Sequence, residues 1–329
     1  MNFITHLFRI AKYGTSYAIA TGFFPKKTAK KVLLLYSFVR IPDNIVDDVS
    51  SSWGTKDPVN QKSLLQSHYK QAKKKLITLK NSRTQAYTNN LREDAQRGQY
   101  VSLFQDNNIP FQYSIDFFKA MIDDCTVHRY KTYEQLEWYM YGSASVVGLM
   151  MCHIIWFIDK KYEKKAKSYA TVLWNAMQLT NFLRDVREDF EELDRIYIPI
   201  SPLEKGGRGD PISNRWSSPT LLAKEEVLHD DIISFCHWGY STASKEKKKA
   251  RADMMKVYIS KCRAMYAHSL DGLQYLNPEW RKAVRLAALL YESILDKIES
   301  NDYDVFTKSC RTNLKDKFQT LYNHNRQWK

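Results

Sequence analysis

Two long stretches of this chain, residues 161–193 and 244–300, contain almost no glycine or proline. These two residue types are the strongest local breakers of regular structure, so their scarcity over such lengths favours long helices. The whole chain has 329 residues, with only 11 glycines and 9 prolines, and its 44% hydrophobic content suffices for one large domain or two small ones. We therefore predict an all-α protein, with its clearest loops at residues 51–61 and 201–219.

The segment from Asn175 to Pro199, NAMQLTNFLRDVREDFEELDRIYIP, is predicted as one helix because apolar residues recur at helical spacing. At about 100° per residue, its polar side chains fall within an arc of roughly 100°. Apolar residues such as Leu179 and Phe182 occupy much of the remaining circumference. Two interpretations stay open: the stripe lines a cavity inside a helical protein, or it is an acidic face in contact with solvent. The stripe consists of Gln178, Asn181, Asp185, Glu188 and Asp189.

Two pairs of aspartates repeat the same spacing. Asp43 and Asp47 lie one helical turn apart, and Asp185 and Asp189 do the same further along the chain. Carboxylates at this spacing repel each other in an isolated helix, and a divalent cation is the usual compensation. Mg²⁺ prefers oxygen ligands and commonly combines one or two carboxylates with phosphate oxygens and water. The two pairs therefore predict a site in which facing helices hold several Mg²⁺ ions.

The cysteines argue against a disulfide framework or a zinc site. No two of them form a C-x-x-C pair, and the N-terminal segment has too short an apolar run for a convincing signal peptide. We expect reduced thiols and a cytoplasmic location. No apolar stretch reaches the roughly 18 residues of a spanning helix, so residues 146–158 are expected to form a buried helix or a cavity wall. The cysteines are Cys125, Cys152, Cys236, Cys262 and Cys310.

The formal net charge of +14 calls for an anionic partner or a solubility explanation. Basic residues cluster at residues 26–31, 70–75 and 244–251. No zinc finger or RNA-binding pattern is present, so a nucleic-acid partner is not expected. Simple solubility and peripheral contact with an anionic membrane surface remain the two interpretations.

Five stretches in order along the chain resemble the squalene/phytoene synthase family, whose members join prenyl diphosphates head to head. YSFVRIPDNIVDD and QLTNFLRDVREDFEELDRIYIP resemble its two aspartate-rich motifs. Residues 16–25 resemble its substrate flap, residues 139–151 its tyrosine-glycine pocket helix, and residues 290–306 its C-terminal segment. The likeness covers nearly the whole chain, and it is greater to phytoene synthases than to squalene synthases. It implies a single isoprenoid synthase domain over residues 1–329, with long helices around a central apolar cavity.

The resemblance also implies roles for individual residues. Asp43 and Asp47 would bind Mg²⁺ from one wall of the cavity, and Asn181, Asp185 and Asp189 from the other; the four aspartates would thereby act in catalysis. Tyr141 corresponds to a catalytic tyrosine on the pocket wall. The positions that correspond to residues contacting the diphosphates or the first isoprene carbons are Ser16, Tyr36, Arg40, Gln178, Arg184, Tyr291 and Lys308.

By the same resemblance, the expected activity is the Mg²⁺- or Mn²⁺-dependent condensation of two geranylgeranyl diphosphates to phytoene, without NADPH. The alternative is a C15 enzyme that makes squalene or dehydrosqualene, and a non-catalytic lipid-binding relative ranks below both. The polar end of the sequence, LKDKFQTLYNHNRQWK, shows no membrane anchor, which leads us to expect peripheral attachment.

Three features depart from the family pattern or leave the substrate open. Asn44 stands where many members have a second aspartate, and Pro42 lies inside the expected helix, where its ring should kink it. Small residues after Tyr141, among them Ser145 and Gly148, could leave room for a longer prenyl chain or allow close packing of helices. The sequence leaves both interpretations open.

Overall fold

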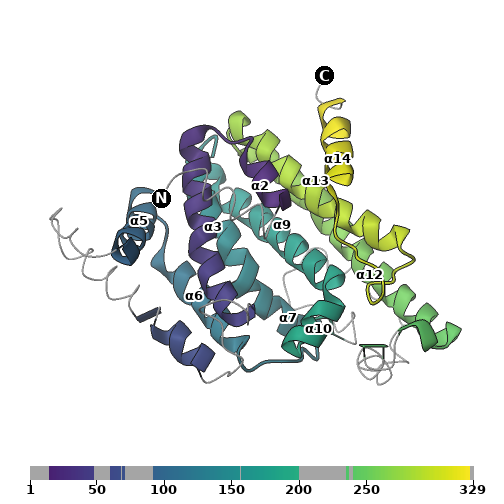
Figure 1. Cartoon of the computed structure of the whole chain (residues 1–329). Helices are drawn as coiled ribbons and strands as arrows, with labels where there is room; N and C mark the ends of the chain where they lie inside the picture. Colours follow the sequence, from purple (N-terminus) through teal and green to yellow (C-terminus); the bar gives the residue numbers. More distant parts are fainter. Residues whose placement is uncertain are drawn as a thin grey trace. The chain divides into compact units, whose positions relative to one another are not determined.

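The computed structural model describes residues 15–47, 60–67, 69–70, 92–155, 157–199, 235–236 and 240–326. Those residues are mainly helical, and the only strand-like pairings among them are two isolated bridges, Arg129–Ile196 and Phe157–Leu276. Figure 1 shows the helices in chain order. The prediction of an all-α fold is confirmed. Residues 51–59 and 201–219 of the predicted loops lie outside the described ranges, whereas residues 60 and 61 are helical.

The chain forms two compact units, each assembled from several stretches. The first comprises Met1–Thr126, Gly142–Thr171 and Gly272–Val284; the second comprises Val127–Tyr141, Val172–Asp271 and Arg285–Lys329. Helices α9 (Glu163–Arg184) and α13 (Pro278–Ser300) supply residues to both units. The single-domain assignment stays a prediction.

In the first unit, α3 (Lys26–Asp47) contacts α2 (Thr15–Thr21), α5 (Arg92–Asp106), α6 (Phe111–Asp123) and α8 (Val146–Ile154). Its apolar positions, such as Val32 and Leu35, are fully buried. Phe38 packs against the rings of Phe104 and Phe118, with centroids 5.1 and 6.0 Å away. Pro42 lies inside α3 and is buried, so the helix continues through the proline to the end of the first aspartate motif.

A short π-helical turn, η1 (Tyr141–Ser145), precedes α8. A Cβ atom at Gly142 would lie 2.7 Å from the Cβ of Ala120 and 3.0 Å from the carbonyl oxygen of Asp116, so α6 approaches too closely for any side chain there. The predicted apolar helix at 146–158 is confirmed as far as Ile154, and most of its residues are buried. This part of the chain therefore packs closely against α6 at Gly142, and large apolar side chains of α8 are buried beyond it.

The second unit contains α7 (Tyr133–Met140), α10 (Val186–Leu193), α12 (Lys245–Leu270), α14 (Leu314–Arg326) and the remaining parts of α9 and α13. Ser244 caps α12 by accepting a hydrogen bond from the amide of Lys247, and α13 begins with Pro278, whose fixed φ suits a first helical position. Short helical turns lie at Lys160–Tyr162, Tyr240–Thr242 and Asp271–Tyr275. Tyr258 and Tyr266 of α12 are completely buried in this unit.

The prediction of one helix from Asn175 to Pro199 is wrong in two places. The helix is interrupted at Asp185, whose φ of −101° and ψ of 15° are not helical, and α10 ends at Leu193. Asp194 follows in the left-handed conformation with a φ of 51°. Arg129 donates to its carboxylate at 2.6 Å, which holds the chain in this turn. Residues beyond it are not helical, because tertiary contacts overrode the apolar spacing that predicted a continuation.

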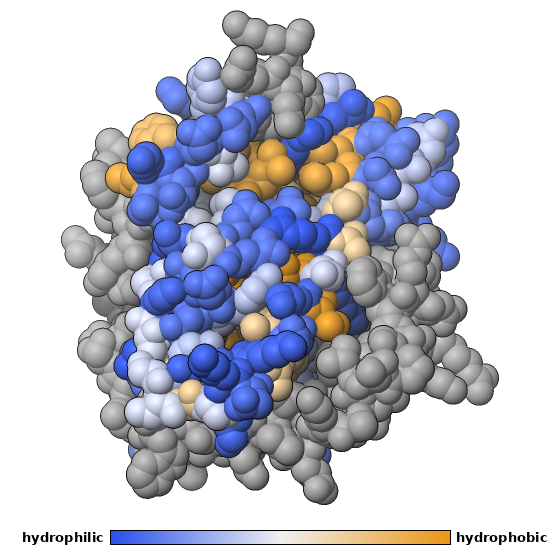
Figure 2. All heavy atoms as spheres, turned by 90° about the vertical axis from the view of Figure 1, so that its right-hand side faces the viewer, coloured by the Kyte–Doolittle hydropathy of each residue, from blue (hydrophilic) through white to orange (hydrophobic). Residues whose placement is uncertain are grey.

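All five cysteines are free thiols, which agrees with the expectation of reduced cysteines. Within the described part of the chain, no helix combines the length and the apolar character needed to span a bilayer. Figure 2 shows apolar atoms at the surface in small groups bordered by hydrophilic side chains. The large apolar side chains that are exposed include Trp138, Leu314, Phe318 and Tyr322.

Candidate active site

The first group of predicted site residues lies on one helix of the first unit. Tyr36, Arg40, Asp43 and Asp47 follow one another on α3 at intervals of three or four residues, which places them along one side of the helix. Arg40 donates from a terminal nitrogen to Oδ2 of Asp43. Burial acts to lower the pKa of Arg40, but the negative charge of Asp43, together with Tyr36 and Asp47, outweighs burial and raises it. The helix therefore carries two carboxylates around one firmly protonated guanidinium.

Helix α2 packs against this part of α3. Ser16 is buried, with 9% of its surface exposed, and the rings of Tyr17 and Tyr36 stack with centroids 5.0 Å apart. Tyr17 also lies 4.0 Å from the sulfur of Met151 on α8. Two of the predicted substrate-binding residues, Ser16 and Tyr36, therefore belong to neighbouring helices of the same unit.

Asn44 offers an unused oxygen beside the first motif. Its Oδ1 atom is buried and accepts no hydrogen bond from the part of the chain that the structure describes. A buried amide oxygen without a donor is unfavourable and suits a cation or a water molecule bound to one. The donor set of Asp43, Asn44 and Asp47 is thus entirely hard oxygen and fits Mg²⁺ in type.

The second group of predicted site residues runs along α9 and α10 in the second unit. Gln178, Asn181, Asp185 and Asp189 are half-buried, while their neighbours Leu179, Phe182, Leu183 and Val186 are buried. The amide of Asp185 donates to the carbonyl of Asn181 at 2.9 Å, and the amide of Asp189 to the carbonyl of Asp185 at 2.8 Å. These bonds maintain one stripe across the helix interruption.

A tight ion pair marks the centre of the stripe. Arg184 donates from Nε to Oδ1 of Asp185 at 2.7 Å and from a terminal nitrogen to Oδ2, a two-point contact between groups that are 18% and 17% exposed. Burial acts to lower the pKa of Arg184, but Asp185, with contributions from Tyr291 and Asp189, raises it. Tyr291 of α13 is therefore near enough to influence the charge of Arg184, and its role in substrate binding stays a prediction.

Two basic residues that the sequence analysis did not select also reach this cluster. Arg311 contacts Glu188 and comes within 4.0 Å of the carboxylate of Asp185. Lys317 is only 6% exposed, and its pKa is lowered by burial and then by the positive charge of Arg184. Their signal was the basic run after residue 306, KSCRTNLKDK, from which only Lys308 was selected.

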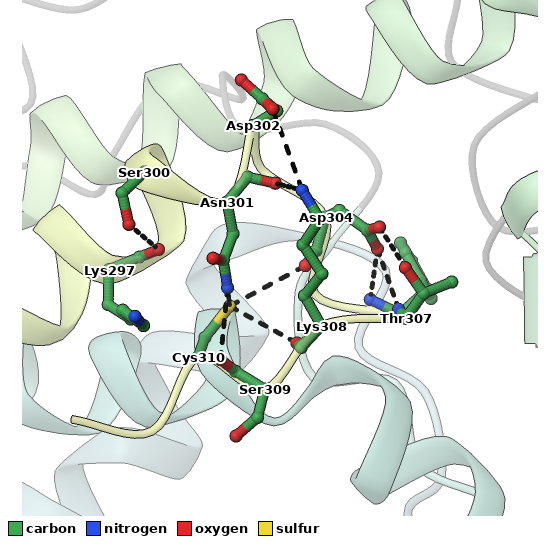
Figure 3. A network of polar contacts seen from close by, with 10 residues as sticks. Lys297, Ser300, Asn301, Asp302, Asp304, Thr307, Lys308, Ser309 and Cys310 are labelled. Carbon is green, nitrogen blue, oxygen red and sulfur yellow. Dashed lines mark hydrogen bonds and ion pairs between the residues drawn. The ribbon is translucent and has the colours of Figure 1, made fainter. Parts of the chain in front are cut away.

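Lys308 itself lies on a rigid turn after α13. Asp302 and Tyr303 both have positive φ angles, 59° and 61°, and the carboxylate of Asp304 accepts from the amides of Phe306 and Thr307 at 3.0 and 2.8 Å. Figure 3 shows Lys308 extending back across this turn, where its Nζ donates to the carbonyl of Asn301 at 3.3 Å. The ammonium also lies 3.8 Å from the carboxylate of Asp302. Lys308 is exposed, and its contacts within the described residues do not include the aspartates of either motif.

Tyr141 lies at the C-terminal end of α7 and is 39% exposed. It begins the π-helical turn η1, a feature that often occurs at functional sites. Ser145, at the end of the same turn, is completely buried. The roles of Tyr141 on a pocket wall and of Ser145 at a pocket floor stay predictions.

Each unit thus presents an aspartate pair with an arginine bonded to one of its carboxylates. Within the described residues, three or more carboxylate, histidine or cysteine side chains do not gather into one metal-binding group. The clusters suit the recognition of a diphosphate through divalent cations, with the arginines as further positive charges. A Mg²⁺ site shared between the two motifs stays a prediction.

Comparison with known proteins gives matches along most of the chain. The sequence model of the family described as Squalene/phytoene synthase matches residues 10–224 and 237–316. Phytoene synthase 2 of Oryza sativa subsp. japonica is 26% identical over 317 residues, covering 94% of this chain and 67% of that protein. The 15-cis-phytoene synthase of a Synechocystis strain is 27% identical over 312 residues, covering 91% of this chain and 77% of that protein.

Among solved structures, a dehydrosqualene synthase in complex with a ligand aligns with a TM-score of 0.71 at 20% identity, covering 99% of this chain and 96% of that one. Squalene synthase HpnC from Alicyclobacillus acidocaldarius aligns with a TM-score of 0.63 at 17% identity, covering 90% and 93%. These likenesses show the fold. The chain spans about two thirds of the length of the plant phytoene synthases that it matches over more than nine tenths of its own length.

Proposed function

Because the chain belongs to the squalene/phytoene synthase family, we propose that it is a prenyltransferase that condenses two geranylgeranyl diphosphates head to head into 15-cis-phytoene, a step of carotenoid biosynthesis. The observation that carries this proposal is the cluster around Asp185, where Arg184 and Arg311 accompany the aspartates of the second motif. The phytoene synthases among its relatives support the C20 substrate.

The metal-binding residues in this proposal are Asp43 and Asp47 in the first unit and Asn181, Asp185 and Asp189 in the second. Bound Mg²⁺ or Mn²⁺ would neutralise the negative charge that develops on a departing diphosphate. Arg40, Arg184 and Arg311 supply fixed positive charges beside these carboxylates. The contribution of Arg40 and Arg184 grows as charge accumulates on the leaving group, which is the condition for accelerating ionisation rather than merely binding substrate. Arg311, which is exposed and paired with Glu188, would hold the diphosphate of the bound substrate.

The carbon chemistry proceeds in two stages. In the first, one prenyl diphosphate loses its diphosphate, and the 2,3 double bond of the second molecule attacks the allylic cation. Loss of a proton closes a cyclopropane and gives a cyclopropylcarbinyl diphosphate. In the second stage this intermediate loses its own diphosphate, rearranges and releases another proton. The sum is two diphosphates, two protons and one C40 hydrocarbon, with no reductant, which agrees with the expectation that NADPH is not used.

The remaining substrate-binding assignments follow the same logic. Ser16 and Tyr36 would contact one substrate from the first unit. Gln178, Tyr291 and Lys308 would act from the second, Lys308 after leaving its contact with the turn. Tyr141 would line the prenyl pocket, where an aromatic face can stabilise a carbocation without attacking it.

A C15 reaction that yields squalene or dehydrosqualene is the second candidate. Its support is the fold of the dehydrosqualene synthase and squalene synthase structures. A non-catalytic relative should have lost some of the carboxylates, and all four aspartates are present here. We further propose a cytoplasmic protein that binds an anionic membrane surface peripherally through its basic clusters, since its substrates and products are lipids.

Product analysis tests this proposal. The purified protein is incubated with geranylgeranyl or farnesyl diphosphate, with and without Mg²⁺, and the extracted hydrocarbon is analysed by mass spectrometry. We expect a C40 hydrocarbon, formed only with the metal. A C30 product from farnesyl diphosphate alone would identify the second candidate, and no hydrocarbon from either substrate would overturn the assignment as an enzyme.

A further inference from the structure

Helix α14 (Leu314–Arg326) exposes three of its four large apolar side chains, which is unusual for a helix that packs only on its own protein. Leu314, Phe318 and Tyr322 recur every four residues and form one stripe, and they are 64%, 65% and 58% exposed. Away from the stripe, Lys317 is buried, and Thr320 and Leu321 are half-buried. Thus a lysine faces the protein and three large apolar side chains face outward.

The helix is nevertheless well defined by its own residues. The side chain of Asn313 accepts from the amide of Asp316, and the carboxylate of Asp316 accepts from the amide of Asn313, both at 2.9 Å. This reciprocal capping box fixes the start of the helix. On the exposed side, Gln319 donates to Asn323 at 3.1 Å. Figure 1 shows α14 in yellow as the last helix of the chain.

The charges beside the stripe favour one kind of surface. The exposed polar residues of α14 whose side chains are described are Lys315, Gln319 and Asn323, and none of them is acidic. The acidic residue of the helix, Asp316, is half-buried and engaged in the cap. Lysine next to Tyr, Phe and Leu is the composition of a helix that lies in a bilayer interface, where the ammonium reaches the headgroups while the apolar face enters the acyl boundary.

A second copy of the chain is a poorer match to this stripe. Phe and Tyr side chains bury about 150–250 Å² each when fully covered, so the two aromatic side chains and the smaller Leu314, each about two thirds exposed, offer roughly 400 Å² at most. A stable interface needs about 800 Å² from each partner. The apolar stripe alone therefore falls well short of a dimer interface, whereas interfacial binding of a helix to lipid requires no such area.

We propose that α14 is the element that docks this protein onto an anionic lipid membrane, with Leu314, Phe318 and Tyr322 inserted and Lys315 at the headgroups. The choice of a lipid surface rests on the proposed function, because a prenyltransferase whose substrate and product are lipids has to exchange them with a bilayer. The buried side of the same helix carries Lys317, whose pKa is lowered by burial and then by the positive charge of Arg184, so docking would take place on a helix that also places a cation near the second aspartate motif.

The test is co-sedimentation of the full chain with vesicles of phosphatidylglycerol and phosphatidylcholine. The variant Phe318→Ser/Tyr322→Ser should bind at least about tenfold more weakly, since two large apolar side chains no longer enter the bilayer. Ile158→Ser is the matched control, because Ile158 is 52% exposed in the first unit, and it should bind like the unaltered protein. The unaltered protein should bind neutral vesicles more weakly than anionic ones.

Two further measurements separate the outcomes. Hydrocarbon synthesis from detergent-solubilised substrate should be the same in the double variant as in the unaltered protein; if neither makes product, the proposed function fails, whatever the vesicles show. Analytical ultracentrifugation reports self-association. Equal vesicle binding by the double variant, no binding by the unaltered protein, or a dimer that the double variant dissociates without loss of vesicle binding would each overturn the assignment of α14.

Discussion

Among single residues, Asp185 gives the most direct test of the metal site. Asp185→Asn keeps the size of the side chain but removes a hard ligand and the partner of Arg184, so we expect turnover to fall by about a hundredfold or more. Helix content measured by circular dichroism should not change. Glu191→Gln is the control. Glu191 lies outside the stripe and pairs with Arg187 at 2.8 Å, so this variant should retain activity. Unchanged turnover of Asp185→Asn at saturating substrate would remove this residue from the metal site.

Arg311 separates binding from chemistry. It contacts Glu188 and approaches Asp185, so its guanidinium can exchange these carboxylates for a diphosphate. Arg311→Gln should raise KM for the prenyl diphosphate about tenfold, the loss of one charge-assisted contact. Lys256→Gln is the matched control, because Lys256 pairs with Asp253 at 3.0 Å on an exposed part of α12. Steady-state kinetics with no change in KM would assign Arg311 a purely structural role.

At the scale of elements, two glycines in helices have opposite surroundings. Gly142 faces Ala120 and the backbone of Asp116 within 3.0 Å, whereas a Cβ at Gly98 of α5 meets nothing within 4 Å. Gly142→Ala should lower the free energy of unfolding by about 1–3 kcal/mol through overpacking. Gly98→Ala should raise it by about 0.5–1 kcal/mol through helix propensity. Chemical denaturation measures both, and equal effects would show that α6 does not press on η1.

A polar cluster that joins four segments predicts a pH dependence of stability. Nε2 of His153 on α8 lies 3.0 Å from Nζ of Lys167, and Lys167 pairs with Glu163 at 2.7 Å. The ring of His153 also bonds to the backbone of Asn107. The side chain of Asn107 in turn accepts a hydrogen bond from Lys31 at 2.6 Å. Burial and then Lys167 lower the pKa of His153, although Glu163 and the bond to Asn107 act the other way.

A histidine whose pKa is lowered in the folded state binds more protons when unfolded. Its contribution to stability is therefore complete above the ordinary histidine pKa of about 6.5 and is lost as the pH falls below that value. The pKa of Glu163 is lowered too, through its hydrogen bond to Lys167, so the loss from that carboxylate comes at lower pH. The melting temperature should decrease from pH 7.5 to about 5.5, and His153→Gln should flatten this slope. An equal slope in the variant would show that His153 does not titrate in this range.

At the scale of the whole molecule, ligand binding should be visible as stability. Pyrophosphate with Mg²⁺, which represents the leaving group and its metal, should raise the melting temperature, because a ligand at a hundredfold excess over its Kd stabilises by about 2.7 kcal/mol. Pyrophosphate without the metal should have a much smaller effect. The variant Asp43→Asn/Asp47→Asn tests whether the first motif takes part, since its loss should abolish the metal-dependent shift. A full shift in that variant would restrict the site to the second unit.

Local patterns in the sequence were enough to predict the helical class, the family and the two aspartate motifs. Gly and Pro are scarce, the apolar spacing is helical, and the D-x-x-x-D pairs are local patterns of one helical turn, although the second pair begins at the interruption between α9 and α10. Helical geometry also placed Gln178, Asn181 and Asp185 in one stripe beside apolar neighbours, but it left open whether solvent covers that stripe; the structure shows it half-buried. Such patterns can be recognised in the sequence because helical periodicity places residues three or four apart on the same face.

The ends of those helices, and the distant residues that contact their side chains, are known from the tertiary structure alone. The non-helical backbone at Asp185 and the left-handed Asp194 have no counterpart in the apolar spacing, and Asp194 is bonded to Arg129, which is distant in sequence. Arg311 and Lys317 come to the second motif from more than a hundred residues away, and the basic run in which they lie does not show which of its cations turn toward the aspartates. The outward stripe of α14 was equally hidden, because the sequence shows that a helix is amphipathic but only packing decides which face the protein covers.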